Sequence, residues 1–181
     1  YKMRVMQNRG RSVRTGRAKA LALALACLPA LSACETFLEA DAVRTHPVEG
    51  KLVDIGGRRI QIDCQGEGGP TVVFQSGGDM LGSLGWKPVM ERVKTKARAC
   101  AYSRAGILWS DPAQEKFEPE EVARDLHAAL AAAGEKPPYV LVAHSRGGLY
   151  NLIFAGLYRD EVVGMVFADS SHPDQEKRFR E

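Results

Sequence analysis

Short apolar segments bounded by glycine turns predict strands at the start of the folded region. Residues 52–55 and 58–64 form two such segments, and in the second the apolar and polar residues alternate with the period of a half-buried strand. Residues 71–75, TVVFQ, form a continuous apolar run, which is typical of a strand covered on both faces. We therefore expect three strands before residue 76.

Two longer segments carry the spacing of an amphipathic helix. Residues 86–99 have apolar residues at intervals of four, namely Val89, Val93 and Ala97. A second helix begins at Pro119, where the missing N–H does no harm, and ends at Gly134. Its apolar stripe consists of Val122, Leu126, Ala129, Leu130 and Ala133.

Strands and helices continue to alternate toward the C-terminus. Residues 98–102 and 139–143 are apolar segments of strand length, residues 149–158 are expected to be helical, and a further strand over 164–168 ends at Asp169. Parallel strands need crossover helices. The order therefore predicts an α/β fold with a mostly parallel sheet and helices on both faces.

Residues 1–33 have the composition of a bacterial export signal. Seven of the 25 Lys and Arg residues lie there and no Asp or Glu does, and an apolar stretch of about a dozen residues follows the basic start. That stretch is shorter than the roughly 20 apolar residues that span a bilayer. LSAC, residues 31–34, resembles the bacterial lipobox. This implies that Cys34 is the lipidated N-terminus of an exported protein, anchored to a bacterial membrane on its periplasmic or cell-surface side.

Two other interpretations of this segment stay open. It can be an ordinary signal peptide that is cut at the small residues Ser32 and Ala33, or a helix that is retained. Residues 34–50 show no clear period, and we interpret them as a lipidated tether. Residues 51–181 then form the folded domain.

The composition fits one ordinary globular domain. Hydrophobic residues make up 45% of the 181 residues and charged residues 26%. The net charge of +3 comes from the basic N-terminus, and the rest is mildly acidic, so nucleic acid is not an expected partner. The cysteines and histidines lack the spacing of metal ligands, and we expect neither a metal nor a cofactor.

The segment LVAHSRGGLY, residues 141–150, places one serine between a predicted strand and a predicted helix. Chemistry in a parallel sheet takes place at the carboxyl ends of the strands, where Ser145 lies. A turn that projects the hydroxyl needs small residues two positions to either side, and Ala143 and Gly147 supply them. Ser145 is therefore a candidate nucleophile, below which a helix N-terminus can stabilise an oxyanion.

Three segments, VVFQSGG, YSRAG and PPYVLVAHSRGGLYNLIFAGLYRDEVVGMVFADSSHPDQ, occur in the order that α/β-hydrolases of the esterase and peptidase type have them. From about residue 51 the chain resembles the first two-thirds of such an enzyme, without the last strands of the sheet. The resemblance implies that Ser145 is the nucleophile and that the N–H groups of Gly78 and Arg146 form the oxyanion hole. The alternative for SGGD, residues 76–79, is a turn that only ends a strand.

The acid and the base that would activate Ser145 are not evident. The family places its acid usually after the seventh strand and its histidine after the eighth, and this chain reaches the sixth. Asp169 is a possible acid at the end of that strand, although this position is more often structural. His172 is the least unfavourable base. The other histidines are less suitable by position: His46, His127 and His144.

The segment YSRAGILWSD departs from the family's YDRAGxGxSD pattern. Ser103 stands in place of an aspartate and Leu108 in place of a glycine. The missing carboxylate removes an acceptor for Arg104, and we expect a looser loop as a result.

The resemblance also implies a disulfide between Cys64 and Cys100. In the family's sheet the second strand, which Cys64 ends, lies antiparallel beside the fourth, which Cys100 begins. Neighbouring strands are about 4.8 Å apart and bridged Cα atoms about 4.4–6.8 Å apart, so the bridge is allowed, and export would let it persist. The alternative is two small buried residues that are close but unbonded.

Two hypotheses for the function follow. In the first, the chain is an exported lipoprotein hydrolase that acts on a small-molecule or lipid-like ester or amide, with its acid and base beyond Glu181 in a longer parent. In the second, it is a truncated, catalytically inactive hydrolase-like lipoprotein.

Overall fold

The computed structural model describes residues 43, 45–78, 81–113 and 118–178. The chain divides into two compact units, residues 1–38 and 39–181, and all described residues belong to the second. The predicted signal peptide, Cys34 and most of the predicted tether lie outside the described residues. None of the described helices combines the length and the apolar content that crossing a membrane requires.

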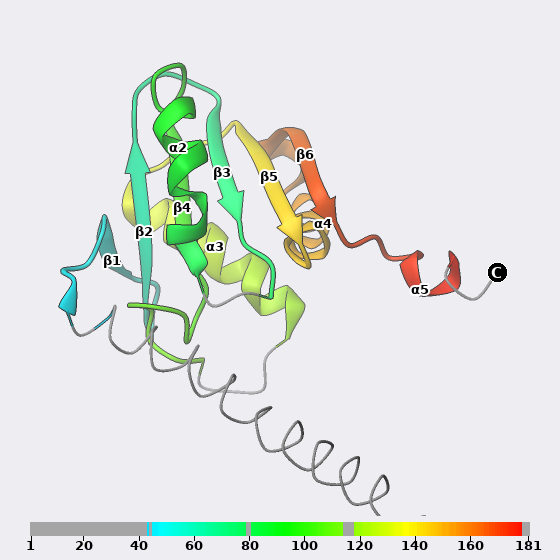
Figure 1. Ribbon diagram of the computed structural model, residues 1–181, viewed down its shortest axis with the longest axis horizontal. Helices are drawn as coiled ribbons and strands as arrows, with labels where there is room; N and C mark the ends of the chain where they lie inside the picture. Colours follow the sequence, from blue (N-terminus) through cyan, green and yellow to red (C-terminus); the bar gives the residue numbers. More distant parts are fainter. Residues whose placement is uncertain (1–42, 44, 79–80, 114–117, 179–181) are drawn as a thin grey trace, which may run out of the picture. The chain divides into compact units, whose positions relative to one another are not determined.

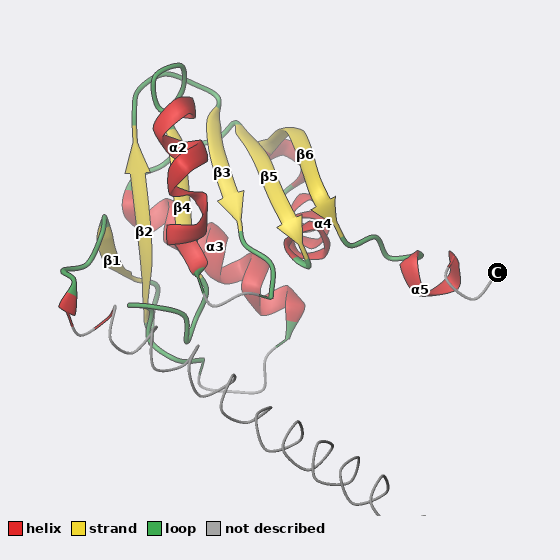
Figure 2. Ribbon diagram, in the orientation of Figure 1, coloured by secondary structure: helices red, strands yellow, loops and turns green. Residues whose placement is uncertain are grey.

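Six strands of the described part of the chain form one mixed sheet in the order β1-β2-β4-β3-β5-β6 (Figure 2). β2 pairs antiparallel with β1 and β4, whereas β4, β3, β5 and β6 run parallel to one another. The expected mostly parallel α/β fold is confirmed. The strands are β1 (Lys51–Asp54), β2 (Arg59–Gln65), β3 (Thr71–Gln75), β4 (Ala99–Ser103), β5 (Tyr139–Ser145) and β6 (Val162–Ser170).

Helices cover both faces of this sheet. Figure 1 shows α2 on one face and α3 and α4 on the other. The larger apolar core lies under α3 and α4 and contains Ile60, Tyr102, Leu126 and Phe154, and the smaller core under α2 contains Phe74 and Met90. The helical segments are η1 (Gly82–Trp86), α2 (Lys87–Val93), α3 (Pro119–Ala133), α4 (Gly147–Leu157), η2 (Arg159–Glu161) and α5 (Gln175–Arg178).

The helix expected over residues 86–99 is shorter than predicted and buries a different residue. α2 ends at Val93, and Met90 rather than Val89 is its buried residue, with Val89 43% exposed. A 3-10 turn precedes α2, and only seven residues are α-helical. A spacing of four residues defines one face of a helix only when the helix has about three turns. α2 has about two turns, and Met90 rather than Val89 joins Phe74 in the smaller core.

A disulfide joins β2 to β4. Cys64 and Cys100 are register partners in this antiparallel pair, and their Cα atoms lie 4.1 Å apart. Cys100 is fully buried in the larger core. The bond joins residues that are 36 apart in sequence and thereby lowers the conformational entropy of the unfolded chain.

β6 is the last strand of the sheet order and carries exposed apolar side chains. None of the nine residues of β6 is buried and six are exposed, whereas β5 has three buried residues. The exposed residues are Val163, Met165, Val166 and Phe167.

The disulfide predicts a loss of stability when it is removed. The double variant Cys64→Ala/Cys100→Ala is expected to unfold with a free energy about 2–4 kcal/mol lower, because its unfolded chain regains the entropy of the open loop. Urea denaturation of the oxidised proteins measures this difference. A reductant should lower the free energy of unfolding of the wild type to that of the variant and leave that of the variant unchanged. Identical denaturation curves for the oxidised wild type and the variant would contradict the prediction.

Candidate active site

Ser145 ends β5 and lies two residues before α4. Its φ is +53°, a left-handed conformation that residues other than glycine rarely adopt. β5 lies between the parallel strands β3 and β6, so the serine stands at the carboxyl end of the parallel part of the sheet. The strand-to-helix turn that the sequence predicts around Ser145 is therefore present.

Two glycines allow other backbone segments to approach this turn closely. A Cβ atom added at Gly77 would lie 2.7 Å from the Ser145 Cβ and 3.2 Å from its Oγ. A Cβ at Gly147 would lie 2.6 Å from the carbonyl oxygen of Gln75. Real Cβ atoms do not come this close, so the loop after β3 can contact the serine turn only because both positions lack a side chain.

The serine hydroxyl is half-buried and makes no hydrogen bond to any residue that the structure describes. The surrounding backbone is fixed instead. The N–H of Ser171 donates to the carbonyl oxygen of Ser145 at 2.9 Å, and the Ser170 hydroxyl donates to the carbonyl oxygen of Ala143 at 2.9 Å. The end of β6 and the residue after it thus hold the backbone of the turn.

Of the two residues expected to supply oxyanion donors, Arg146 belongs to this turn and Gly78 to the loop after β3. Arg146 follows Ser145 and precedes α4, and Gly78 follows the glycine that touches the serine. The Arg146 guanidinium carbon is 3.8 Å from the position of a Cβ atom at Gly78. The loop after β3 and the start of α4 are therefore adjacent, and the α4 N-terminus adds partial positive charge.

The possible acid and base make no described hydrogen bond to Ser145. Asp169 is exposed at the end of β6, with φ +48°. His172 is exposed, and its Nδ1 accepts the N–H of Asp174 at 3.1 Å. Neither side chain has a hydrogen bond to Ser145 in the described structure.

The remaining histidines have other surroundings. His127 stacks on Tyr158 with ring centroids 3.8 Å apart and lies 3.1 Å from a Glu161 oxygen. His46 lies 2.9 Å from the Thr45 hydroxyl, and His144 is exposed beside the serine. Among the described residues, no histidine is therefore hydrogen-bonded to Ser145.

The expectation of a loose loop around Ser103 and Arg104 is wrong. Ser103 is fully buried, and its hydroxyl donates to Gln61 Oε1 at 2.7 Å. Arg104 takes a different acceptor, because its Nη1 donates to the carbonyl oxygen of Ser76 at 2.8 Å. Gln61 also accepts from the Ser83 hydroxyl at 2.9 Å, so the buried polar groups satisfy one another.

Sequence reasoning assigned no role to Gln75, which is 1% exposed at the end of β3. Tyr102 donates its hydroxyl to Gln75 Oε1 at 2.6 Å. Burial raises the pKa of Tyr102 well above its ordinary value, although nearby Arg104 and the bond to Gln75 oppose the shift, so Tyr102 stays a protonated donor. The available signal was a single polar residue that ends an otherwise apolar run, TVVFQ.

An open groove of about 590 Å³ lies along α4 next to the serine turn. Apart from Arg146 at one end, the residues that line it are apolar or aromatic. They are Pro119, Leu149, Tyr150, Leu152, Ile153 and Pro173.

One group of possible metal ligands occurs among the described residues, namely Cys64, Cys100 and Glu135. The two sulfur atoms form the disulfide, so neither is a thiolate ligand. Glu135 pairs with Arg98 at 2.6 Å.

Residues 66–180 match the model of a protein family described as the alpha/beta hydrolase fold. Among curated proteins, the chain is 33% identical over 110 residues to the uncharacterized protein YqjL of Bacillus subtilis, covering 61% of this chain and 43% of that protein. It is 27% identical over 128 residues to YbdG of the same organism, also uncharacterized, covering 70% of this chain and 39% of that protein. The chain thus spans less than half the length of these relatives.

Solved structures share the fold at low identity. The meta-cleavage product hydrolase CumD of Pseudomonas fluorescens aligns with a TM-score of 0.62 and 18% identity, over 68% of this chain and 46% of that one. The haloalkane dehalogenase DatA of Agrobacterium tumefaciens aligns with a TM-score of 0.60 and 20% identity, over 76% of this chain and 49% of that one. A thermophilic esterase of Thermogutta terrifontis aligns with a TM-score of 0.59 and 23% identity, over 72% of this chain and 50% of that one.

The tight contact at Gly147 predicts a sharp difference between two glycines of α4. Gly147→Ala is expected to destabilise the fold by about 1–3 kcal/mol, because its methyl group would meet the Gln75 and Ser76 carbonyl oxygens. Gly156→Ala has open space and is expected to stabilise α4 by up to about 1 kcal/mol. Urea denaturation compares the two; a Gly147→Ala protein as stable as wild type would show that the approach is not tight.

Proposed function

Because the chain belongs to the α/β hydrolase fold family, we propose that it is a serine hydrolase in which Ser145 attacks an ester or amide carbonyl. The observation that carries the proposal is the geometry of the serine turn: a strained, half-buried Ser145 against which Gly77 packs without a side chain. A strained backbone of this kind is characteristic of functional sites.

The proposed reaction forms a bond between Ser145 Oγ and the carbonyl carbon while a base takes the hydroxyl proton. The carbonyl oxygen becomes an oxyanion, and the N–H groups of Gly78 and Arg146 stabilise it. Collapse of this intermediate expels the alcohol or amine, which takes up the proton, and leaves an acyl-serine. Water then hydrolyses the acyl-serine and regenerates the hydroxyl.

We assign the base and the acid to a longer parent chain. This is supported by the relatives, of which the chain spans less than half, and by the lack of a base in contact with Ser145 among the described residues. His172 and Asp169 are the alternatives within the chain. A second candidate, a hydrolase-like lipoprotein without activity, is favoured by the same lack of a base, since a serine without one is a poor nucleophile.

The proposed substrate is a small or lipid-like ester or amide. The groove along α4 supports this, because its apolar lining fits an acyl or alkyl group and its Arg146 end adjoins Ser145. The Thermogutta terrifontis neighbour is an esterase by name and the CumD neighbour a hydrolase, which agrees with this class of reaction.

The proposed location is the outer side of a bacterial membrane, reached by export and lipidation at Cys34. The basic start, the short apolar stretch and LSAC support this location. The disulfide agrees with it, since such bonds persist in oxidising compartments.

A fluorophosphonate probe tests the nucleophile. The protein extended by the parent's further sequence, which supplies the base, is expected to be labelled on Ser145, and Ser145→Ala in that protein should lose all labelling because only an activated serine reacts with the probe. Ser171→Ala serves as the matched control and should label like wild type, because Ser171 directly follows β6 and only its backbone N–H contacts Ser145. Mass spectrometry of the labelled peptide identifies the serine.

The outcomes separate the candidates. Labelling that is lost in His172→Ala would place the base within this chain. Absence of labelling in a folded protein, as well as in one extended by the parent's further sequence, would favour the inactive lipoprotein.

The lipid anchor predicts that Cys34→Ala changes the location of the protein. Bacteria that express the full chain and are fed labelled palmitate should incorporate the label into wild type and not into the variant, because no thiol remains for acylation. Cys27→Ala is the control and should incorporate it normally. Equal labelling of wild type and Cys34→Ala would exclude the lipobox interpretation.

A further inference from the structure

We propose that Arg104 is a positioning residue that fixes the direction of the oxyanion-hole amides by holding the carbonyl group of Ser76. The inference rests on the proposed function, because it concerns the loop that carries Gly78. It assigns Arg104 a contact with the loop and none with the substrate.

The carbonyl oxygen of Ser76 is held from several directions. Arg104 Nη1 donates to it at 2.8 Å, and Gln75 Nε2 donates to it at 3.2 Å. A Cβ atom at Gly147 would come within 2.9 Å of it, so the first turn of α4 closes a third side. This carbonyl is buried between the loop, β4 and the helix that follows the serine.

A carbonyl group that is held in one orientation also orients the N–H of the same peptide bond. The peptide bond between Ser76 and Gly77 is planar, so its N–H points opposite to its C=O. Anchoring the Ser76 oxygen therefore sets the direction of the Gly77 N–H and the orientation from which the chain continues to Gly78. Without an anchor, two consecutive glycines have more conformational freedom than any other pair of residues.

The other contacts of the loop do not replace Arg104. The Ser76 hydroxyl donates to the carbonyl oxygen of Gly82 at 2.6 Å, which ties down the side chain of Ser76 and not its peptide plane. Gln75 Nε2 is a neutral donor at a longer distance. A charged donor forms the stronger hydrogen bond, so Arg104 dominates.

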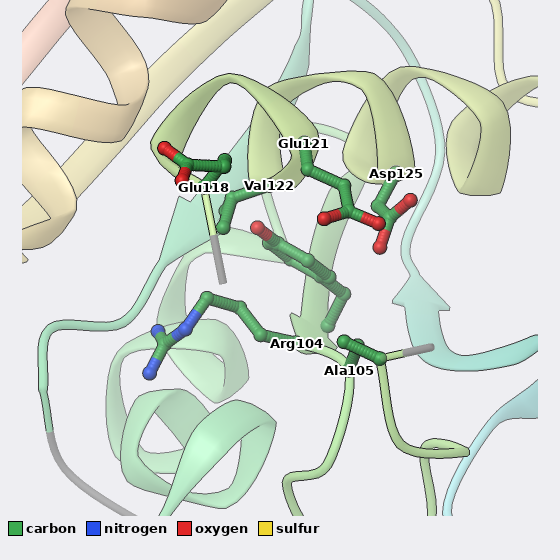
Figure 3. Close-up of a pocket in the computed structure, with 8 residues that line it drawn as sticks. Arg104, Ala105, Glu118, Glu121, Val122 and Asp125 are labelled. Atoms are coloured by element: carbon green, nitrogen blue, oxygen red, sulfur yellow. The ribbon is translucent and has the colours of Figure 1, made fainter. Parts of the chain in front are cut away.

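Arg104 is itself held for this contact. It is only 7% exposed, and its guanidinium carbon lies 5.6 Å from the ring centroid of Tyr150 on α4. Its side chain runs away from the carboxylates of Glu121 and Asp125 (Figure 3). Those two carboxylates pair with Arg58, at 2.5 and 2.7 Å, so they do not compete for Arg104.

The cavity between Arg104 and α3 in Figure 3 has a volume of about 10 Å³. That is hardly room for one water molecule, so a ligand-binding role for Arg104 there has no support. What remains is its link between the loop after β3 and α4, the two elements that carry Gly78 and Arg146.

The test reads the Ser76–Gly77 peptide directly by NMR. This is the only Ser–Gly step in the chain, so labelling serine with carbonyl ¹³C and glycine with ¹⁵N gives one resonance for it. In Arg104→Gln, hydrogen exchange of the Gly77 amide is expected to rise about tenfold, and the Ser76 carbonyl shift to move upfield, because the charged donor is lost. Arg104→Lys, which keeps a charged donor, should show a smaller change.

Arg98→Gln is the matched control. Arg98 directly precedes β4 as Arg104 directly follows it, and it too donates to one loop carbonyl, that of Gly66 at 3.0 Å, while pairing with Glu135. Its loss should lower stability and leave the Gly77 amide unchanged. If Arg104→Gln does not fold, Tyr150→Leu replaces it, and loss of the ring should speed Gly77 exchange about two- to fivefold.

The rate of Ser145 phosphonylation is the second measurement, and Arg104→Gln is expected to lower it about 10- to 100-fold. Gly77 exchange that stays unchanged in the Arg104 and Tyr150 variants, or that rises equally in Arg98→Gln, overturns the inference. If the wild-type protein extended by the parent's further sequence is not phosphonylated, only the proposed function is overturned, because the amide measurement still decides whether Arg104 holds the loop.

Discussion

The candidate site depends on a contact between two stretches of backbone that leaves no space for side chains. The loop after β3 comes against Ser145 at Gly77, and the first turn of α4 comes against the end of β3 at Gly147. β3 and β5 are neighbours in the sheet, so their carboxyl ends meet at one edge. This close approach brings the loop after β3 against the Ser145 side chain. It is also the reason that the serine turn can be strained, since the packed neighbours determine its conformation.

A network of buried polar side chains stabilises the loop after β3. Gln61 accepts from Ser83 and Ser103, and Gln75 accepts from Tyr102 while it donates to Ser76. Buried polar groups are costly unless they are paired, and here each of them has a partner. The network therefore favours one arrangement of the loop over looser ones, and Arg104 adds the only charged donor that the described structure directs at the loop backbone.

Strand β4 connects these features. It is buried along its whole length between β2 and β3. The disulfide fastens its first half to β2, and Arg104 extends from its end to the loop beside Ser145. A central strand can neither shift register nor tilt without breaking the hydrogen-bond ladders on both sides, so β4 provides a fixed base for Arg104.

The sequence by itself determined the order of strands and helices, the caps of α3 and the serine turn, because these follow from local periodicity and from residues such as Pro119, Gly134 and Gly147. It also implied, through the resemblance, that Cys64 meets Cys100. It misjudged α2, whose buried residue depends on what the opposite sheet face offers, and it misjudged the loop at Ser103. Only the tertiary structure decided that Arg104 holds Ser76 and that Gln75 accepts from Tyr102, because these partners are 28 and 27 residues apart and no local pattern selects one distant acceptor over another.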